Sequence, residues 1–87
     1  MSYQVSLRQA AQKQLDKLAE KDYEIVAEAI LALEQEPRPL RVKKLAGSGL
    51  WRIRIGSYRV VYAIDDEECL VIVVRVARRT EDTYKRL

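Results

Sequence analysis

The sequence contains no histidine, and Cys69 is its single cysteine. One cysteine cannot form an intramolecular disulfide, and without histidine or a second thiol the chain cannot build the usual tetrahedral zinc site. The absence of imidazole also removes the commonest general acid and base of enzymes. We therefore expect no metal and no cofactor, and any catalysis must use arginine, lysine, tyrosine or carboxylate side chains.

Long apolar runs are absent as well. No stretch of the chain approaches the roughly 20 apolar residues that a membrane-spanning helix needs. The N-terminal segment also lacks the basic region and apolar core of a signal peptide. Hydrophobic residues make up 48% of the 87 residues, which is enough for one compact core. We expect a single domain over residues 1–87 and a cytoplasmic location.

Acidic residues are missing from one long segment. The net charge is only +3, but not one Asp or Glu occurs from Pro37 to Ile64. The cations of this segment are Arg38, Arg41, Lys43, Lys44, Arg52, Arg54 and Arg59. One half of the fold is therefore expected to be electropositive, as in a protein that binds a polyanion.

The pattern of apolar residues divides the chain into a few elements. Alternation predicts a short strand at Tyr3–Leu7, and apolar positions at helical spacing predict a helix over residues 8–19. A second helix is expected from Asp22, as its N-cap, until Pro37 stops it. The segment 37–49 is rich in proline, glycine and charge, and is expected to be a connector without regular structure. Further strands are expected at Leu50–Ile55, Tyr58–Ile64 and Cys69–Ala77.

This order of elements, β-α-α-β-β-β, predicts an α+β fold in which two N-terminal helices pack on an antiparallel sheet. The run LVIVVRV is apolar on both faces and is expected to be the most enclosed strand. The acidic turn DDEE, residues 65–68, is expected to be solvated. The amphipathic helices need an apolar sheet face to cover.

The stretch Trp51–Tyr62, WRIRIGSYRVVY, supplies such a face. A two-residue turn at Gly56-Ser57 pairs Arg54 with Arg59 and fixes the register of the hairpin. In this register the apolar residues share one face: Trp51, Ile53, Ile55, Tyr58, Val60 and Tyr62. The opposite face carries Arg52, Arg54 and Arg59, together with the apolar positions Val61, Ile72 and Val74, which we expect to be partly exposed.

Placing Arg54 opposite Arg59 destabilises a sheet by up to roughly 1 kcal/mol, and a local cost of this kind often marks a functional site. Guanidinium groups are planar, permanently charged and able to bind phosphate in bidentate fashion. With Arg52 alongside, these arginines indicate a phosphate cradle. The alternative is a set of solvated arginines splayed apart in water.

The C-terminal segment RVARRTEDTYKRL adds Arg78, Arg79 and Tyr84. A tyrosine near a chain end commonly covers the core. Alternatively, nearby cations would lower the pKa of its phenol from about 10 and move Tyr84 towards use as a general base.

The segment LWRIRIGSYRVVYAID, preceded by KKLAGSG and followed by VVRVARRTEDTY, resembles the RelE group of the RelE/ParE toxin superfamily. The resemblance covers nearly the whole chain. It implies a microbial RNase-like fold, cleavage of messenger RNA in the A site of the 70S ribosome, and inhibition of translation. It also implies neutralisation by a RelB-like antitoxin, in a toxin–antitoxin heterotetramer that binds operator DNA through the antitoxin.

The resemblance further implies roles for single positions. Arg54, Arg59, Arg79 and Tyr84 match catalytic positions, in a metal-independent attack by the 2′-hydroxyl of RNA. Contacts to RNA phosphates are expected from Arg41, Lys43, Lys44, Arg52 and Arg78. Relatives often have lysine at positions 52 and 54, and arginine is a poor proton acceptor. Arg54 is therefore expected to be an electrostatic clamp rather than a base.

Two other functions stay open. ParE-like relatives share the fold but inhibit DNA gyrase without acting as nucleases, and a catalytically decayed toxin would bind RNA without cutting it. Retention of Arg52, Arg54, Arg79 and Tyr84 together favours the nuclease. An antitoxin with an amphipathic, acidic helix would suit a face that combines arginines with exposed apolar residues.

Overall fold

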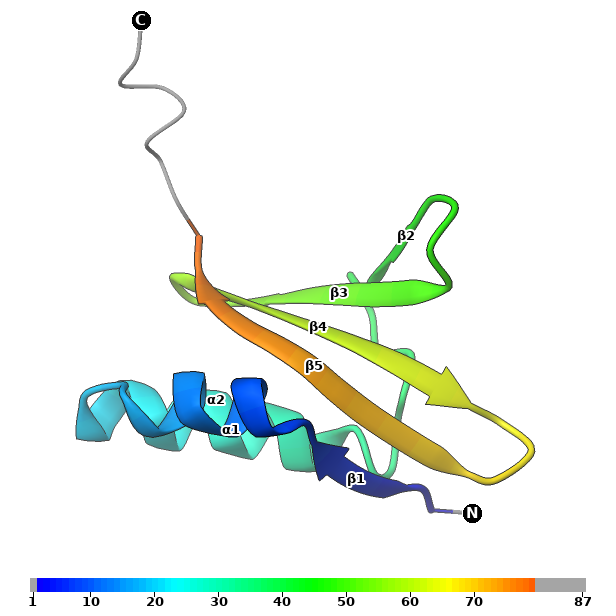
Figure 1. Ribbon diagram of the computed structural model, residues 1–87, viewed down its shortest axis with the longest axis horizontal. Coiled ribbons are helices and arrows are strands. Elements are labelled where there is room, and N and C mark those ends of the chain that lie inside the picture. Colours follow the sequence, from blue (N-terminus) through cyan, green and yellow to red (C-terminus); the bar gives the residue numbers. More distant parts are fainter. Residues whose placement is uncertain (1, 80–87) are drawn as a thin grey trace, which may run out of the picture.

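The computed structural model describes residues 2–79. A first strand, β1, is followed by two helices and four further strands, which together form a five-stranded sheet in the order β1-β5-β4-β3-β2. The elements are β1 (Gln4–Leu7), α1 (Gln9–Asp16), α2 (Glu20–Ala32), β2 (Lys43–Leu45), β3 (Leu50–Ile55), β4 (Tyr58–Asp65) and β5 (Leu70–Arg78). Both helices lie on the same side of the sheet (Figure 1). The predicted α+β architecture, with two helices packed on a sheet, is confirmed.

The sheet is mixed. Strands β3 to β5 are antiparallel, as predicted, and β2 pairs antiparallel with β3. Strand β1 instead pairs in parallel with β5, from Gln4 opposite Leu70 to Leu7 opposite Val73. The first and last strands therefore lie side by side in the sheet, and β5 is enclosed between β1 and β4 (Figure 1). Its position explains why its sequence is apolar on both faces.

The expectation of an irregular connector over residues 37–49 is wrong at Lys43–Leu45, which form the edge strand β2. Lys43 lies opposite Arg52, and the turn into β3 uses Gly47 and Gly49, both with a φ of 75° that favours glycine. A three-residue strand with two lysines has no alternation of apolar and polar residues, so the periodicity of the sequence does not predict it. Lysine on an edge strand is nevertheless common, because it disfavours edge-to-edge association.

Helix α2 begins two residues before the predicted N-cap. Its N-cap is Ala19, which offers no side-chain hydrogen bond, while Glu20 and Asp22 lie in the first turn, where carboxylates interact favourably with the helix dipole. The Asp22 carboxylate instead accepts a hydrogen bond of 2.8 Å from the hydroxyl of Tyr58. A contact with the sheet, and not a local cap, therefore occupies this side chain, and the bond raises the pKa of Tyr58.

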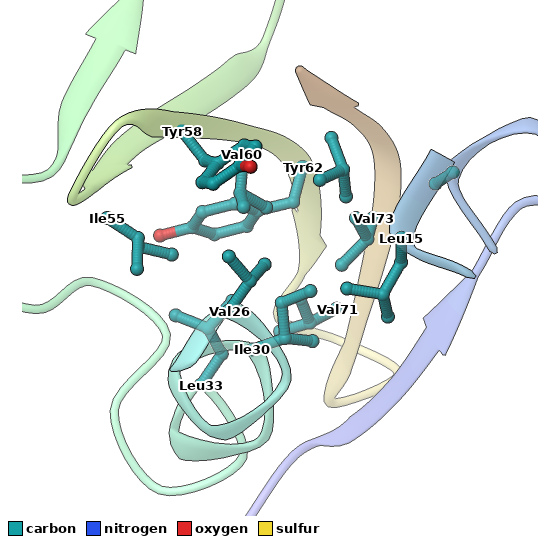
Figure 2. Close-up of a cluster of buried hydrophobic side chains, with 12 residues drawn as sticks. Leu15, Val26, Ile30, Leu33, Ile55, Tyr58, Val60, Tyr62, Val71 and Val73 are labelled. Carbon is teal, nitrogen blue, oxygen red and sulfur yellow. The ribbon is translucent and has the colours of Figure 1, made fainter. Parts of the chain in front are cut away.

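The core lies between the helices and the sheet (Figure 2). Helix-side residues and strand residues that are at most 4% exposed point toward one another here: Leu15, Val26, Ile30, Leu33, Val60, Tyr62, Val71 and Val73. Tyr62 is fully buried, and its hydroxyl donates a 2.7 Å hydrogen bond to the carbonyl of Pro37. Burial raises the pKa of Tyr62 to about 12. The apolar face predicted for the hairpin is thus the face that the helices cover.

The predicted hairpin register is confirmed in each pair, including Arg54 opposite Arg59. The neighbouring ladder between β4 and β5 contains a β-bulge. Val61 lies opposite Arg75 and Tyr62 lies opposite Val73, so Val74 is an extra residue on β5. The bulge changes which residues of β5 face the helices.

The acidic turn between β4 and β5 is more than a solvated loop. Asp66 accepts a 2.6 Å hydrogen bond from the hydroxyl of Tyr3 and forms an ion pair with Arg38 at 2.8 Å. The Arg38 guanidinium also lies 5.0 Å from the ring centroid of Trp51. Hydrogen bonds from Arg38 and Tyr3 lower the pKa of Asp66. Arg38 therefore connects the segment after α2 to the β4–β5 turn.

Within residues 2–79, no helix has the length and apolar character that spanning a membrane requires.

Candidate active site

The sheet face opposite the helices presents side chains in rows that cross the strands. One row consists of Lys43, Arg52, Val61 and Arg75, and the next consists of Arg54, Arg59 and Ala77. Neighbouring strands lie about 4.8 Å apart, so these side chains share one patch. We call it the arginine face and define it by Arg52, Arg54, Arg59 and Arg75.

A first cavity of about 270 Å³ on this face is lined by Arg41, Lys43, Arg52 and Arg54. All four lining residues are cations. Arg41 has a φ of 76°, a left-handed conformation that costs a residue other than glycine about 1–2 kcal/mol. The cavity brings together positions from the connector, β2 and β3, and its chemistry suits a phosphate group.

A second cavity of about 230 Å³ lies beside the first, since Arg52 lines both. Its lining combines arginines with apolar side chains: Leu45, Arg52, Arg59, Val61, Arg75, Ala77 and Arg78. The Nε atom of Arg59 is buried and has no hydrogen-bond partner among residues 2–79. A buried donor without a partner costs about 1–3 kcal/mol, and an oxyanion bound in the cavity could accept its hydrogen bond.

Arg79 is held at the turn of the β3–β4 hairpin. Its backbone N–H donates to the carbonyl of Ser57 at 2.6 Å, and its Nη1 donates to the carbonyl of Gly56 at 3.3 Å. This turn is the end of the hairpin that carries Arg54 and Arg59. The structure therefore brings three of the expected catalytic residues to one end of the sheet, and Tyr84 lies outside the described residues.

Two of the expected phosphate contacts have aromatic partners on the helix side of the sheet. The Arg78 guanidinium lies 5.3 Å from the ring centroid of Tyr58 and donates to its hydroxyl at 3.3 Å, on the helix side of the sheet. Lys44 lies opposite Trp51, and its ammonium is 5.5 Å from the indole ring, also on that side. Alternation along β2 separates Lys44 from the arginine face, whereas Arg78, the last residue of β5, also lines the second cavity.

Val61 departs from the expected exposure. It lies on the arginine face, but it is only 9% exposed, whereas Ile72 and Val74 are half-buried as expected. Arginine side chains have long apolar stems that cover neighbouring apolar surface, and those around the second cavity border Val61.

Arg75 is the site residue that sequence patterning missed. The sequence offers one sign of its role: uninterrupted alternation from Val71 and Val73 would place residue 75 in the core, and an arginine does not fit there.

Proton acceptors are absent from the described residues that line the two cavities, which are all cationic or apolar. The described tyrosines with raised pKa values, Tyr3, Tyr58 and Tyr62, lie away from the cavities. Each is protonated at neutral pH. This part of the site can therefore orient an anion and stabilise negative charge, but it does not itself remove a proton.

Comparison with known sequences places the chain in a family. Residues 5–83 match the sequence model described as the ParE toxin of the type II toxin–antitoxin system, parDE. The chain is 38% identical to toxin RelG of Mycobacterium tuberculosis, over 99% of this chain and 100% of that protein. It is 30% identical to the putative toxin RelE1 of Methanocaldococcus jannaschii, over 98% of each.

Solved structures agree. The M. tuberculosis toxin–antitoxin complex RelBE2 contains a chain with a TM-score of 0.82 and 33% identity, covering 91% of this chain and 100% of that one. A chain of the archaeal RelE–RelB complex of Pyrococcus horikoshii has a TM-score of 0.82 and 31% identity, over 93% and 99% of the two chains. These findings define the class, a toxin of a type II toxin–antitoxin system. The chain belongs to the RelE/ParE superfamily, as its motifs indicated.

Proposed function

We propose that the protein is an endoribonuclease that cleaves messenger RNA in the ribosomal A site and so inhibits translation. The observation that carries the proposal is the arginine face, where cations line two adjacent cavities, the second of which also has apolar lining residues. The buried Nε of Arg59 has no hydrogen-bond partner among residues 2–79. The similarity to RelE toxins supports it. No carboxylate occurs among the described residues that line the cavities, so the site suits a polyanion.

The chemistry follows from what RNA brings. Its 2′-hydroxyl loses a proton and attacks the adjacent phosphorus, and the bond to the 5′-oxygen breaks as that oxygen takes up a proton. In the proposal, Arg54 and Arg59 hold the scissile phosphate and stabilise the developing negative charge, which needs no metal ion. Arg79 lies near the leaving oxygen and Arg52 orients the backbone. Tyr84, outside the described residues, is assigned to deprotonation of the 2′-hydroxyl.

Dependence on the ribosome follows from the lack of a proton acceptor among the described residues that line the cavities. Without a strong base, cleavage of free RNA is expected to be weak, and the ribosome supplies the in-line geometry that accelerates attack. Arg41 and Lys43 are assigned to phosphates at the edge of the site. Lys44, on the helix side, is left for contacts with ribosomal RNA, and Arg78, which also lines the second cavity, is assigned to an RNA phosphate other than the scissile one. These contacts predict a steep dependence of activity on salt.

Primer extension on a defined messenger RNA in a purified translation system tests the proposal. New ends within A-site codons are expected only when ribosomes are present, and they should weaken in Arg59→Ala and Tyr84→Phe. Lys21→Ala, at an exposed position on α2, is the matched control and should cleave like the wild type. Intact RNA in all lanes, or full activity of Arg59→Ala, would overturn the assignment.

Inhibition of DNA gyrase is the second candidate, because the matching family model is described as a ParE toxin. A supercoiling assay separates the two candidates: inhibition of gyrase together with intact messenger RNA would favour this one. A protein that binds RNA without cutting it and spares gyrase would be a decayed toxin.

The antitoxin partner is part of the proposal. Similar chains were solved in complexes with antitoxins, among them the archaeal RelE–RelB pair. An acidic amphipathic helix of a RelB-like antitoxin would pair its carboxylates with the arginine face and cover the half-buried Ile72 and Val74. Co-purification with the antitoxin, as a heterotetramer that binds operator DNA, is the expected state before the toxin is released.

A further inference from the structure

The β-bulge decides which way Arg75 points. Val71 and Val73 are fully buried against the helices, and strict alternation would direct residue 75 into the same core. Because Val74 is an extra residue on β5, the alternation shifts by one position. Val76 then returns to the core at 3% exposure, and Arg75 lies on the arginine face, where it lines the second cavity. Bulges commonly re-aim a side chain next to a functional site.

Arg75 and Arg52 lie in one row, on either side of Val61. Two strand spacings, about 10 Å, separate their backbones. Val61 forms an apolar floor between them. Ala77, in the neighbouring row, and Leu45, on strand β2, add to the apolar lining of this cavity. The second cavity therefore has a cationic rim and an apolar floor, whereas the residues that line the first cavity are all cations.

The charge at this cavity is not neutralised within the described part of the chain. The ion pair found among residues 2–79 joins Arg38 to Asp66, and neither residue lines the cavity. In the same cavity the buried Nε of Arg59 also has no partner among those residues. A free guanidinium, an unpartnered donor and an apolar floor together fit a nucleotide. Its phosphate would bind the arginines, and its sugar and base would lie over the floor or against a guanidinium plane.

We infer that Arg75 is a further RNA-binding residue. With Arg52 and Arg59 it holds the nucleotide next to the scissile phosphate, and Val61 contacts the sugar or base of that nucleotide. The inference rests on the proposed function and deepens it, because it assigns a second nucleotide position and names the bulge at Val74 as the backbone feature that supplies it. Arg75 binds substrate and takes no part in proton transfer.

Side-chain NMR tests the contact without any cleavage. The probe is a short 2′-O-methyl oligoribonucleotide, which lacks the nucleophile, and the readout is the Nε–Hε signal of each arginine, assigned with single Arg→Lys variants. Signals of Arg52, Arg59 and Arg75 are expected to shift together. Arg8, exposed before α1, is the control and should not shift. An unmoved Arg75 signal while Arg52 and Arg59 shift, or no shift in the three, would overturn the inference.

Kinetics on programmed ribosomes supply the second test. Arg75→Ala is expected to raise KM by about 10-fold and to leave kcat within about 2-fold of the wild type, because a binding contact is lost. The slope of log KM against log salt should fall by about 0.7, the value for one phosphate contact on a single strand. Arg75→Lys should restore the slope, and Arg8→Ala should behave as the wild type. A fall in kcat alone, or an unchanged salt slope, would contradict a phosphate contact.

The two proposals fail separately. If the wild type does not cleave but the Arg75 signal shifts with Arg52 and Arg59, RNA binding at the second cavity stands and the nuclease assignment falls. If the wild type cleaves and Arg75→Ala matches Arg8→Ala in KM and salt slope, the nuclease stands and the role of Arg75 falls.

Discussion

The two faces of strand β4 show how one sheet serves two purposes. Val60 and Tyr62 point to the helices and are fully buried. Arg59 directly precedes Val60, Val61 directly precedes Tyr62, and both of these residues line the second cavity. The helix face is held by apolar burial, worth about 25 cal/mol per Å² removed from water. The arginine face gathers like charges that repel one another. Alternation along the strand therefore separates the residues that stabilise the fold from those that cost stability and are proposed to bind an anion.

The largest effect is expected on the helix face. Tyr62→Ala removes a fully buried ring and its hydrogen bond to Pro37, and should lower the free energy of unfolding by about 3–5 kcal/mol. Urea unfolding measures the loss. Tyr62→Phe keeps the ring and should cost only about 1 kcal/mol. If Tyr62→Ala cost no more than an arginine-face substitution, the contrast between the faces would be wrong.

Arg59→Ala should show the opposite behaviour. Removing one donor that stabilises transition-state charge lowers kcat by about 100-fold or more in enzymes, and we expect a loss of that size in ribosome-dependent cleavage. Stability should stay the same or rise slightly, because Arg54 loses its like-charged neighbour. Single-turnover cleavage and urea unfolding on the same preparation check both halves. If Arg59→Ala were inactive because it is unfolded, the difference between the helix face and the arginine face would be wrong.

Reversing the charge of Arg54 tests whether like charges on the arginine face destabilise the fold. Arg54→Glu places a carboxylate opposite Arg59, so the pair becomes attractive and the free energy of unfolding should rise by about 0.2–1 kcal/mol while cleavage is abolished. Arg54→Gln removes the repulsion without adding attraction and is the matched control. Thermal and urea unfolding that rank Arg54→Glu below Arg54→Gln would show that the arginines do not repel each other in the folded protein.

The smallest effect concerns the Asp66 turn, away from both cavities. Hydrogen bonds from Arg38 and Tyr3 hold the pKa of Asp66 below its ordinary value of about 3.9, so the unfolded chain binds this proton more tightly. The resulting stability is present above that pH and is lost as pH falls through the folded-state pKa. Asp66→Asn should therefore lower the urea midpoint at pH 6 more than at pH 3. Glu67→Gln, in the same turn, should show no such difference.

Several features could be predicted from local sequence. The two helices, the hairpin register and the sorting of Arg52, Arg54 and Arg59 onto one face follow from periodicity and from a two-residue turn. The start of α2 could not, since a contact between Asp22 and Tyr58 takes the side chain that would have capped it. Strand β2 was also missed, because a three-residue edge strand with two lysines has no apolar pattern.

The sequence by itself determined the element order, the apolar face of the hairpin and the acid-free basic segment, because each depends on spacing along the chain. Only the tertiary structure decided where residues distant in sequence meet. It set β1 beside β5, turned Lys44 to the helix side, brought Arg78 to both Tyr58 and the second cavity, and used the bulge at Val74 to bring Arg75 to the arginine face. The physical reason is that side-chain direction in a sheet depends on pairing with another strand, and an inserted residue changes that direction without leaving a mark in local propensity.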